Sequence, residues 1–573
     1  MPHKLIVIFL LFVLHGLWPS LLIAQQPADI HNQAILTNRL YIEDQRNRNE
    51  AIQVPTYFPI EPMGPVEPSD EQLRQFTVSS IIVEQETQLP DRIKRSIIAR
   101  YLNTPLSITD INQLTRDLTN AYIQLGYITT RVYVGQNQDL TTGVLRLVAV
   151  EGRVQDIVYT YSSRPRPLWN LTAFPNSRGS VLNLRDIEQG IDQISRLQSR
   201  RPQINFLPGN IQGQTIIEIS DQPSNPIHGS LSYDNYSRNQ VSLYPHQLSV
   251  TYDDCLGLHD QLFLQFYTNN DQLGQNNTSV YSSLSIPFSY FTLSLSHSDF
   301  NYSYRIPQVS GILTQTGGTR SSSAQIDMVL YRSQLSKGVF NGSLRSRREF
   351  SHQNSVQIDS QTLTATIAGV GFTHSLFTRW GMISLGSAYA KGISMFDAEY
   401  HPFGSANEPS IFFEKIELRG SITGRGTVIR WPGLYSLTAI AQRTNQTVFP
   451  SDRLSIGGPF TVRGFASDQA QNGENGYYFK NELSFRLPDL IQATQSNATL
   501  AAISPYFALD AGFVQSTDPT ATNPSTGLVG GGVGLRYQRQ SVSLDLLYSV
   551  PIWYPDHVSG TDRPIYFSLG LSL

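Results

Sequence analysis

The stretch Ile456-Gly457-Gly458-Pro459-Phe460-Thr461-Val462-Arg463-Gly464-Phe465 lies late in the chain, between segments in which polar and apolar residues alternate. Its paired glycines and its proline predict a loop, because these residues break the hydrogen-bond ladder of a strand. Its tip places Arg463 beside Gly464, which can adopt backbone angles closed to other residues. An exposed turn would have a similar composition, so the flanking segments must decide between a surface turn and a loop folded back inside a β-barrel.

The segments that follow the loop alternate as strands with one polar and one apolar face do. In residues 477–487 the apolar residues alternate with charged and hydroxyl-bearing ones, and residues 505–514 set Phe507 and Leu509 opposite Asp510. Asp510 is therefore expected on the polar face. If that face lines a barrel lumen, Asp510 can pair with Arg463 of the infolded loop. A charge pair shielded from bulk water holds its geometry better than a surface pair.

The loop, followed by Phe507-Ala508-Leu509-Asp510-Ala511-Gly512, resembles the signature of the TpsB-type transporters of two-partner secretion. This haemolysin and haemagglutinin secretion-activation family is related to the BamA assembly factors. The resemblance implies that Arg463 is held by Asp510 inside the barrel. It also marks Val462, Gly464 and Phe465 as the other residues of the loop motif.

The N-terminal region predicts three segments. Residues 1–24 are expected to be a signal peptide, because Lys4 precedes an apolar run that ends at Ala24 before polar sequence; an anchor helix is the alternative. Residues 25–52 are rich in polar side chains and predict a helix suited to a watery pore, or else a frayed terminus. Residues 53–75 carry regularly spaced prolines and predict an extended linker. The resemblance implies that the helix plugs the barrel and can leave it.

Two repeats of one small module follow. The segments that begin at Ser107 and Asn183 are 76 residues apart, and each has a helix-capping residue, an acid in the first turn and a helical apolar stripe. The stripes are Ile108, Ile111, Leu114, Leu118, Tyr122 and Leu125 in the first helix, and Leu184, Ile187, Ile191, Ile194 and Leu197 in the second. Strand patterns flank both helices. Residues 76–151 and 152–222 therefore resemble tandem POTRA domains, which either bind an extended client peptide at an open sheet edge or act as rigid spacers.

Residues 223–573 contain about sixteen strand-like segments separated by turn residues, which predicts a mainly β chain with a transmembrane β-barrel. A soluble β-sandwich would show the same alternation. The last segment, 565–573, has an unbroken apolar face, as expected of a strand that closes the barrel and faces lipid, although members of the resembled family typically end in phenylalanine and this chain ends in Leu573. Further charges are expected in the lumen: Glu482, Arg486, Arg536 and Asp545.

The composition argues against several other classes of protein. The formal net charge is −3 and only 15% of the residues are charged, so no strong field indicates a nucleic-acid partner. The single cysteine, Cys255, can form neither an intramolecular disulfide nor a zinc site. Motifs of serine hydrolases, zinc proteases and P-loop ATPases do not occur, and His246, His259 and His297 have no metal-ligand spacing. We therefore expect no cofactor, no metal and no enzymatic activity.

The resemblance implies an outer-membrane pore with periplasmic POTRA domains. It would recognise and secrete one large TpsA-type exoprotein, of adhesin or haemolysin type, and act as a monomer in the lipid bilayer. The alternative is a factor of the related superfamily that inserts other barrels into the outer membrane. The sequence names neither the client nor the sheet edge that binds it.

Overall fold

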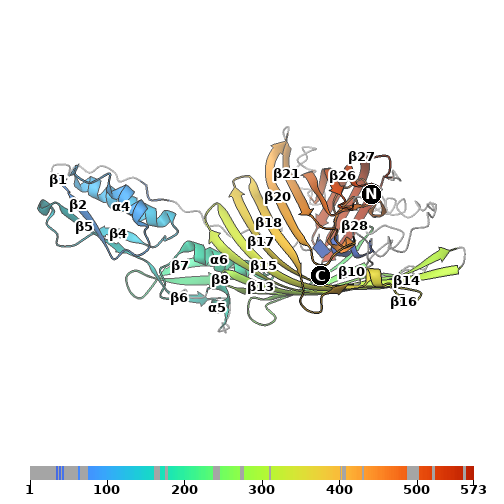
Figure 1. Ribbon diagram of the computed structural model, residues 1–573. Helices are drawn as coiled ribbons and strands as arrows, with labels where there is room; N and C mark the ends of the chain where they lie inside the picture. Colours follow the sequence, from blue (N-terminus) through green and yellow to red (C-terminus); the bar gives the residue numbers. More distant parts are fainter. Residues whose placement is uncertain are drawn as a thin grey trace, which may run out of the picture.

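Two small α/β domains lie beside one end of a closed β-barrel in the computed structural model (Figure 1). The structure describes residues 32, 34–36, 38–40, 42–43, 62–64, 75–160, 168–174, 178–236, 246–270, 276–308, 311–400, 402, 408–428, 431–486, 502–518, 523–558 and 563–572. The predicted signal peptide, residues 1–24, lies outside these ranges. Among the described residues, no helix is both long and apolar enough to cross a membrane.

The first α/β domain packs two helices on one face of a small sheet. Its sheet has the order β2-β5-β4, with β2 parallel and β4 antiparallel to β5, and β1 pairs separately with β3. Its elements are β1 (Phe76–Thr77), β2 (Ser80–Glu84), α3 (Asp91–Ile98), β3 (Pro105–Leu106), α4 (Ile108–Gln124), β4 (Arg131–Val134), η1 (Leu140–Thr142) and β5 (Val144–Val150).

Helix α4 begins as the sequence predicted and buries most of the predicted stripe. The Ser107 side chain accepts the backbone N–H of Asp110, and the Asp110 carboxylate accepts that of Ser107. The buried residues of the stripe are Ile111, Leu114, Leu118 and Tyr122. Ile108, at the first helical position, is 42% exposed. The stripe therefore reaches the core only from the second turn onward.

The second α/β domain repeats this plan, with the sheet order β6-β8-β7. The Asn183 side chain caps α6, and all five residues of the second predicted stripe are buried. Both domains leave one antiparallel strand, β4 or β7, at an edge of the sheet. The elements are β6 (Arg153–Tyr159), α5 (Trp169–Ala173), α6 (Leu184–Ser195), β7 (Gln203–Pro208) and β8 (Gln214–Ser220).

Sixteen long antiparallel strands close the barrel within the described residues, with β28 pairing with β9 from Ser568↔Asp234 to Ser572↔Ser230. The predicted strand number is confirmed. Two short segments, β16 (Val356–Gln357) and β19 (Glu399–Tyr400), extend neighbouring hairpins. The long strands are β9 (Ile227–Asp234), β10 (His246–Asp253), β11 (Gln261–Asn270), β12 (Asn276–Phe288), β13 (Phe291–Gln308), β14 (Gly311–Arg332), β15 (Ser336–Gln353), β17 (Leu363–Thr378), β18 (Gly381–Ile393), β20 (Glu414–Val428), β21 (Trp431–Thr444), β24 (Asn475–Phe485), β25 (Ile503–Gln515), β26 (Ser525–Arg539), β27 (Val542–Trp553) and β28 (Ile565–Ser572).

The apolar side chains of the strands point outward, as the alternation predicted. Phe507 and Leu509 are exposed on the outer face of β25, while Asp510 between Leu509 and Ala511 is fully buried inside. Strand β28 likewise exposes Ile565 and Leu569 and buries Tyr566. In a soluble sandwich the apolar face would be buried, so the observed polarity identifies a membrane barrel.

The described residues between 32 and 43 are helical and lie inside the barrel, where they form the blue segment among the strands in Figure 1. Ala34 packs against the inward side chains of Phe300, Tyr302 and Tyr304 on β13. Of the predicted linker, residues 62–64 lie along α4 of the first domain. The backbone N–H of Met63 donates to the Asn120 side chain at 2.9 Å, and the Asn120 side chain donates to the Met63 carbonyl at 3.1 Å. The chain thus connects a helix in the lumen with the first α/β domain.

Candidate functional site in the barrel lumen

The Ile456–Phe465 loop is the tip of a hairpin folded into the lumen. Its arms are β22 (Leu454–Ile456) and β23 (Gln471–Gly473), which pair with each other and not with the strands of the wall. Val462 and Phe465 are buried in a cluster with Ile456 and with Leu528 of β26. The loop is therefore packed against the inside of the β24–β27 wall.

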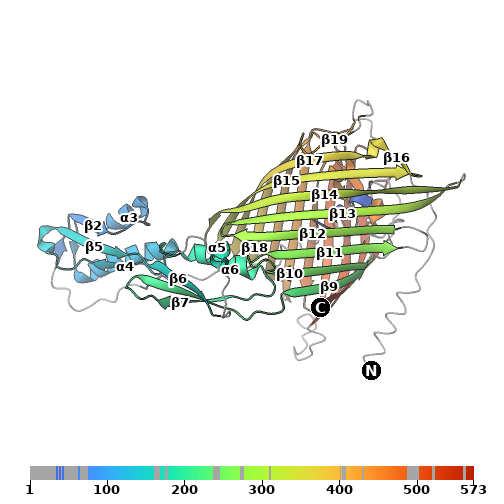
Figure 2. The same ribbon diagram turned by 90° about the horizontal axis from the view of Figure 1, so that it is seen from below.

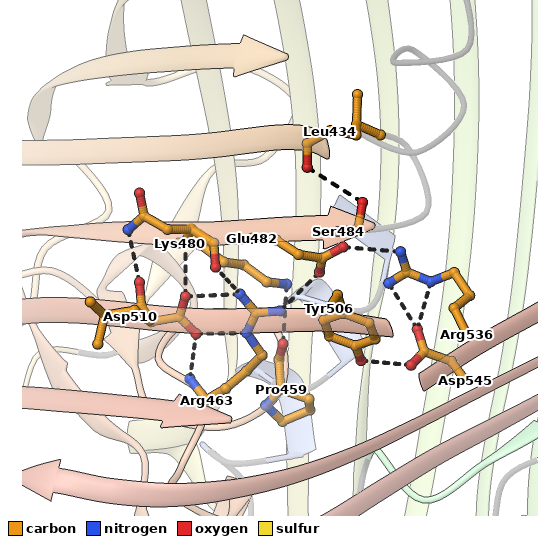
Figure 3. Close-up of polar contacts among 12 residues, drawn as sticks. Leu434, Pro459, Arg463, Lys480, Glu482, Ser484, Tyr506, Asp510, Arg536 and Asp545 are labelled. Atoms are coloured by element: carbon orange, nitrogen blue, oxygen red, sulfur yellow. Dashed lines mark hydrogen bonds and ion pairs between the residues drawn. The ribbon is translucent and has the colours of Figure 1, made fainter. Parts of the chain in front are cut away.

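Arg463 is held by Asp510 through two parallel hydrogen bonds (Figure 3). The Nε atom donates to Oδ2 at 2.7 Å and Nη2 donates to Oδ1 at 2.9 Å. The backbone N–H of Arg463 also donates to Oδ2, at 3.0 Å. This planar two-point geometry is specific to a guanidinium and a carboxylate, and it fixes the loop tip to β25.

The pair also takes the place of strand-to-strand hydrogen bonds in the wall. The register between β24 and β25 runs to Phe479↔Ala511 and resumes only at Glu482↔Ala508. In the gap, the backbone N–H of Asn481 donates to Asp510 Oδ1 at 2.9 Å, and its carbonyl accepts from Arg463 Nη2 at 2.7 Å. The loop arginine and the strand aspartate thus satisfy the backbone of the neighbouring strand.

A second group of charges extends this network along the lumen. Glu482 accepts from Arg463 at 3.1 Å and from Arg536 at 3.0 Å. Arg536 also donates to Asp545, and its guanidinium stacks over the Tyr506 ring at 4.7 Å. Figure 3 shows these side chains in a continuous row from Asp510 to Asp545.

One further predicted lumenal charge lies just beyond its strand. Arg486 follows Phe485, the last residue of β24, and is exposed. Alternation does not give the length of a strand, so it did not predict that β24 ends before Arg486. The place of Arg486 in the lumen stays a prediction.

Gly464 lies where the loop touches the wall. Its φ angle is +112°, and a Cβ atom there would lie 2.4 Å from the carbonyl oxygen of Val550. Gly530, on the strand that faces the loop, also lies against the loop backbone. A Cβ atom at Gly530 would lie 1.8 Å from the Arg463 carbonyl oxygen. Phe465 then accepts a hydrogen bond from Tyr566 at its carbonyl, at 2.6 Å. Two glycines therefore allow the backbone contact that places the loop.

The lumenal helix packs directly on this hairpin. Leu36 and Leu40 line a small cavity together with residues 457–460 of the loop. Arg39 donates to the carbonyl of Arg453 at 2.8 Å and to that of Ser451. Helix and hairpin therefore share a contact surface.

The base of the same hairpin is fixed to the opposite wall. Asp452 accepts two hydrogen bonds from Arg347 of β15, at 2.6 and 3.1 Å, and Arg347 also pairs with Glu349 at 2.7 Å. All three side chains are buried. The helix therefore packs on a hairpin that is fixed to the wall at both its base and its tip.

Comparison with known proteins agrees with this architecture. A family model described as haemolysin secretion/activation protein ShlB/FhaC/HecB matches residues 213–537, more than half of the chain. The chain belongs to this family. Two further models, a POTRA domain of ShlB type and a POTRA domain, match residues 76–152 and 154–208.

Relatives of this ShlB/FhaC/HecB family member are named as transporters. It is 29% identical over 533 residues to the outer membrane transporter CdiB of Dickeya dadantii (strain 3937), with 90% of each chain covered. It is 27% identical over 462 residues to the hemolysin transporter protein HpmB of Proteus mirabilis, with 79% of each chain covered. The solved structure of CdiB from Escherichia coli superposes with a TM-score of 0.85 and 27% identity, over 96% of this chain and 100% of that one.

This member of the family is an outer-membrane translocation pore of two-partner secretion, with its POTRA domains in the periplasm. The end of the barrel that contacts the POTRA domains is therefore the periplasmic end. The opposite end, where the β13–β14 hairpin projects, faces outward (Figure 2).

The second POTRA domain is fixed to the periplasmic rim by a contact that sequence reasoning missed. His259, in the turn between β10 and β11, is fully buried; its ring stacks on Trp169 of α5 at 5.4 Å, and its Nδ1 atom lies 2.9 Å from Thr172 Oγ1. Arg196 of the same domain donates to the His259 carbonyl at 2.7 Å. Sequence analysis established only that His259 has no metal-ligand spacing to other histidines, because no periodicity or motif marks a contact between domains.

Charged groups continue the contact along α6. Arg332 of β14 pairs with Glu188 at 3.3 Å and with Asp192, and Tyr290 in the β12–β13 turn donates to Asp186. Burial raises the pKa of the Asp186 carboxyl, and burial together with the Asp186 charge raises the pKa of the Tyr290 hydroxyl. The domain therefore joins the barrel through the buried ion pair of Arg332 with Glu188 and through hydrogen bonds, as well as through packing.

Proposed function

We propose that this pore secretes one large TpsA-type exoprotein, which its POTRA domains capture in the periplasm. The observation that carries the proposal is the arrangement of the parts: two domains with open sheet edges stand at the periplasmic mouth of a barrel whose lumen holds a helix and the Arg463 hairpin. The names of the relatives, CdiB and hemolysin transporters, support a secreted protein as the client. An adhesin and a cytolysin both fit this chemistry.

Capture would occur by strand addition. Strand β7 is an edge strand of the second domain, and its Phe206 and Leu207 side chains are exposed. Strand β4 is the corresponding edge of the first domain and exposes Tyr133 and Val134. An extended client segment would pair with such an edge through its main chain and place alternate side chains on these apolar residues.

Passage through the barrel would require the lumenal helix to leave. Residues 25–52 are proposed as the plug and 53–75 as its tether, so that the helix stays attached to the POTRA domains after release. The Arg463–Asp510 pair would then set the position of the hairpin in the conducting state. Folding of the client outside the cell would supply the direction of transport, and the chain itself would neither hydrolyse nucleotides nor catalyse another reaction.

The proposed units are residues 76–151 and 152–222 for the two POTRA domains and 223–573 for the barrel. One chain closes the barrel by pairing β28 with β9, which supports a monomeric pore. No cofactor, metal or nucleic acid takes part in the proposed mechanism.

The test compares the proteins of the culture supernatant and of the outer membrane between cells with the chain and cells without it. Loss of one large secreted protein, with other barrels intact, is the expected result, and it identifies the client. A general fall in outer-membrane barrels without a specific secretion defect would contradict the proposal and indicate an assembly factor.

A further inference from the structure

The outer wall formed by β12 to β17 changes from apolar to charged along the strands. The register places outward side chains of neighbouring strands in rows across the wall. The three rows nearest the periplasm are apolar: Phe288, Phe291, Met328, Phe340 and Phe372; then Ile286, Leu293, Ile326, Gly342 and Val370; then Leu284, Leu295, Ala324, Leu344 and Ala368. This wall is the near side of the barrel in Figure 2.

A polar row of Ser282, His297, Ser322, Ser346 and Thr366 comes next on the same outward face, and a charged row follows it. Asp299 of β13 pairs in register with Arg320 of β14, which pairs with Arg348 of β15. The neighbours of these residues point inward, since Phe300 packs on the lumenal helix and Arg347 binds Asp452 of the infolded hairpin. Alternation along each strand therefore places Asp299, Arg320 and Arg348 on the lipid-facing side.

The two arginines have more positive charge than the wall neutralises. Arg320 donates to Asp299 through Nε at 3.1 Å, which leaves both of its terminal amino groups available, and its side chain is 58% exposed. Within the described part of the chain, Arg348 has no carboxylate at ion-pair distance. Like charges directly opposite each other on neighbouring strands are destabilising, so this pair favours an added anion.

The depth of the row indicates where that anion comes from. Asp299 lies eight residues beyond Phe291, the first residue of β13 after its periplasmic turn. A tilted transmembrane strand crosses the hydrocarbon core in about 9 to 11 residues. The charged row therefore lies at the outer boundary of the core, where the headgroups of the outer leaflet begin.

We propose that Arg320 and Arg348 form a binding site for a phosphate group of lipopolysaccharide, the glycolipid of the outer leaflet. Guanidinium groups bind phosphate oxygens through two parallel hydrogen bonds and are the usual residues for this task. Phe350, which lies next to the row and under the Arg320 guanidinium at 5.8 Å, keeps that group in place. The third apolar row, which contains Leu295 four residues below Asp299, contacts the acyl chains of the same lipid, so one molecule spans the charged row and the middle of the wall.

The probe is hexa-acylated lipid A that carries both phosphates, titrated onto the full-length protein in detergent and followed by native mass spectrometry. The double variant R320A/R348A is expected to bind it about thirtyfold more weakly, since each basic side chain near an anionic surface contributes roughly one decade or slightly less. The same lipid with both phosphates removed is expected to bind the unmodified protein as weakly as the variant does. Folding of each protein is checked by its heat-dependent migration on gels.

Two single variants serve as matched controls. Arg345 lies three residues from Arg348 on the same strand but faces the lumen, where it pairs in register with Ser323. Lys391 faces outward but already pairs with Glu414 at 2.7 Å. R345A and K391A should bind lipid A as the unmodified protein does. The proposal is overturned if R320A/R348A binds normally, if a control loses binding equally, or if inorganic phosphate binds the site as tightly as the lipid.

Discussion

Asp510 accepts the backbone N–H of Asn481 at 2.9 Å, at the one place where the described β24–β25 ladder lacks direct pairs. The same carboxylate holds the side chain and the backbone N–H of Arg463. Because Arg463 in turn donates to the Asn481 carbonyl, the infolded hairpin is part of the hydrogen bonding of the wall. Transport and wall stability are therefore expected to respond to the same two side chains.

Replacing Arg463 by alanine should abolish secretion while the protein stays in the outer membrane. The change leaves the buried Asp510 carboxylate without its cation, and breaking a buried pair in this way costs about 3–5 kcal/mol. Secretion is measured as client in the supernatant, and barrel folding by heat-dependent gel migration. R463K is the informative companion, since a lysine cannot make the two-point contact and should restore little secretion.

Normal secretion by R463A would remove the hairpin from the mechanism. Arg425 offers a control, because it lies on β20 away from the loop and its backbone N–H, not its side chain, makes the recorded contact to Trp380. R425A should secrete normally.

The alternation put Asp510 on the polar face and the loop with Gly and Pro could fold inward, but it was the resemblance to the TpsB-type family that implied the Arg463–Asp510 contact. The sequence did not predict the gap in the ladder beside Asn481, since the register of neighbouring strands depends on tertiary contacts. Ile108 marks a similar limit. Periodicity put it in the helical stripe, but it lies at the first position of α4, where the stripe does not yet meet the core.

Replacing Gly464 by alanine should displace the hairpin tip without removing any charge. The new Cβ atom would meet the Val550 carbonyl oxygen at 2.4 Å, in a backbone conformation that L-residues rarely adopt. A strained conformation of this kind costs about 1–3 kcal/mol. We expect reduced secretion and a lower unfolding temperature of the barrel in detergent. Gly342, around which no atom lies within 4 Å of an added Cβ, is the matched position where alanine should have no effect.

Two substitutions in α4 distinguish a residue of the predicted apolar stripe that is buried in the core from one that is exposed. L114A should destabilise the first POTRA domain by about 2–5 kcal/mol, since Leu114 is fully buried, whereas I108A should change stability by less than about 0.5 kcal/mol. Thermal unfolding of the full-length protein in detergent, followed by the helical circular dichroism signal, measures both. Equal losses would contradict the placement of Ile108 at the surface.

The contact at His259 predicts a fixed angle between the second POTRA domain and the barrel. Replacing His259 by alanine removes the ring that Trp169 stacks on and the partner of Thr172. Spin labels at Asn210 and Arg379, both exposed, in a chain with Cys255 replaced by serine, report the distance between domain and rim. H259A should broaden the distance distribution. His246 stacks on Tyr233 within the barrel, so H246A should leave the distribution narrow. A narrow distribution in both variants would show that the ion pairs of Arg332 suffice to hold the domain.

Deleting residues 25–68 should raise the conductance of the pore in planar bilayers, because the described helix residues fill the lumen between β13 and the hairpin. The point variant R39A tests the contact more selectively. It removes the hydrogen bonds to the carbonyls of Ser451 and Arg453 but keeps the helix and its tether, so openings should become more frequent and the conductance of each opening should match that of the deletion.

Asn120 provides the complementary test at the other end of the tether. N120A removes both hydrogen bonds of Met63 to α4, but leaves that of Arg116 to the Gly64 carbonyl, and it does not touch the lumen, so the frequency of openings should not change. An unchanged conductance in the deletion variant would reject the plug, whereas an effect of N120A as large as that of R39A would place control of the helix at the POTRA domain and not at the hairpin.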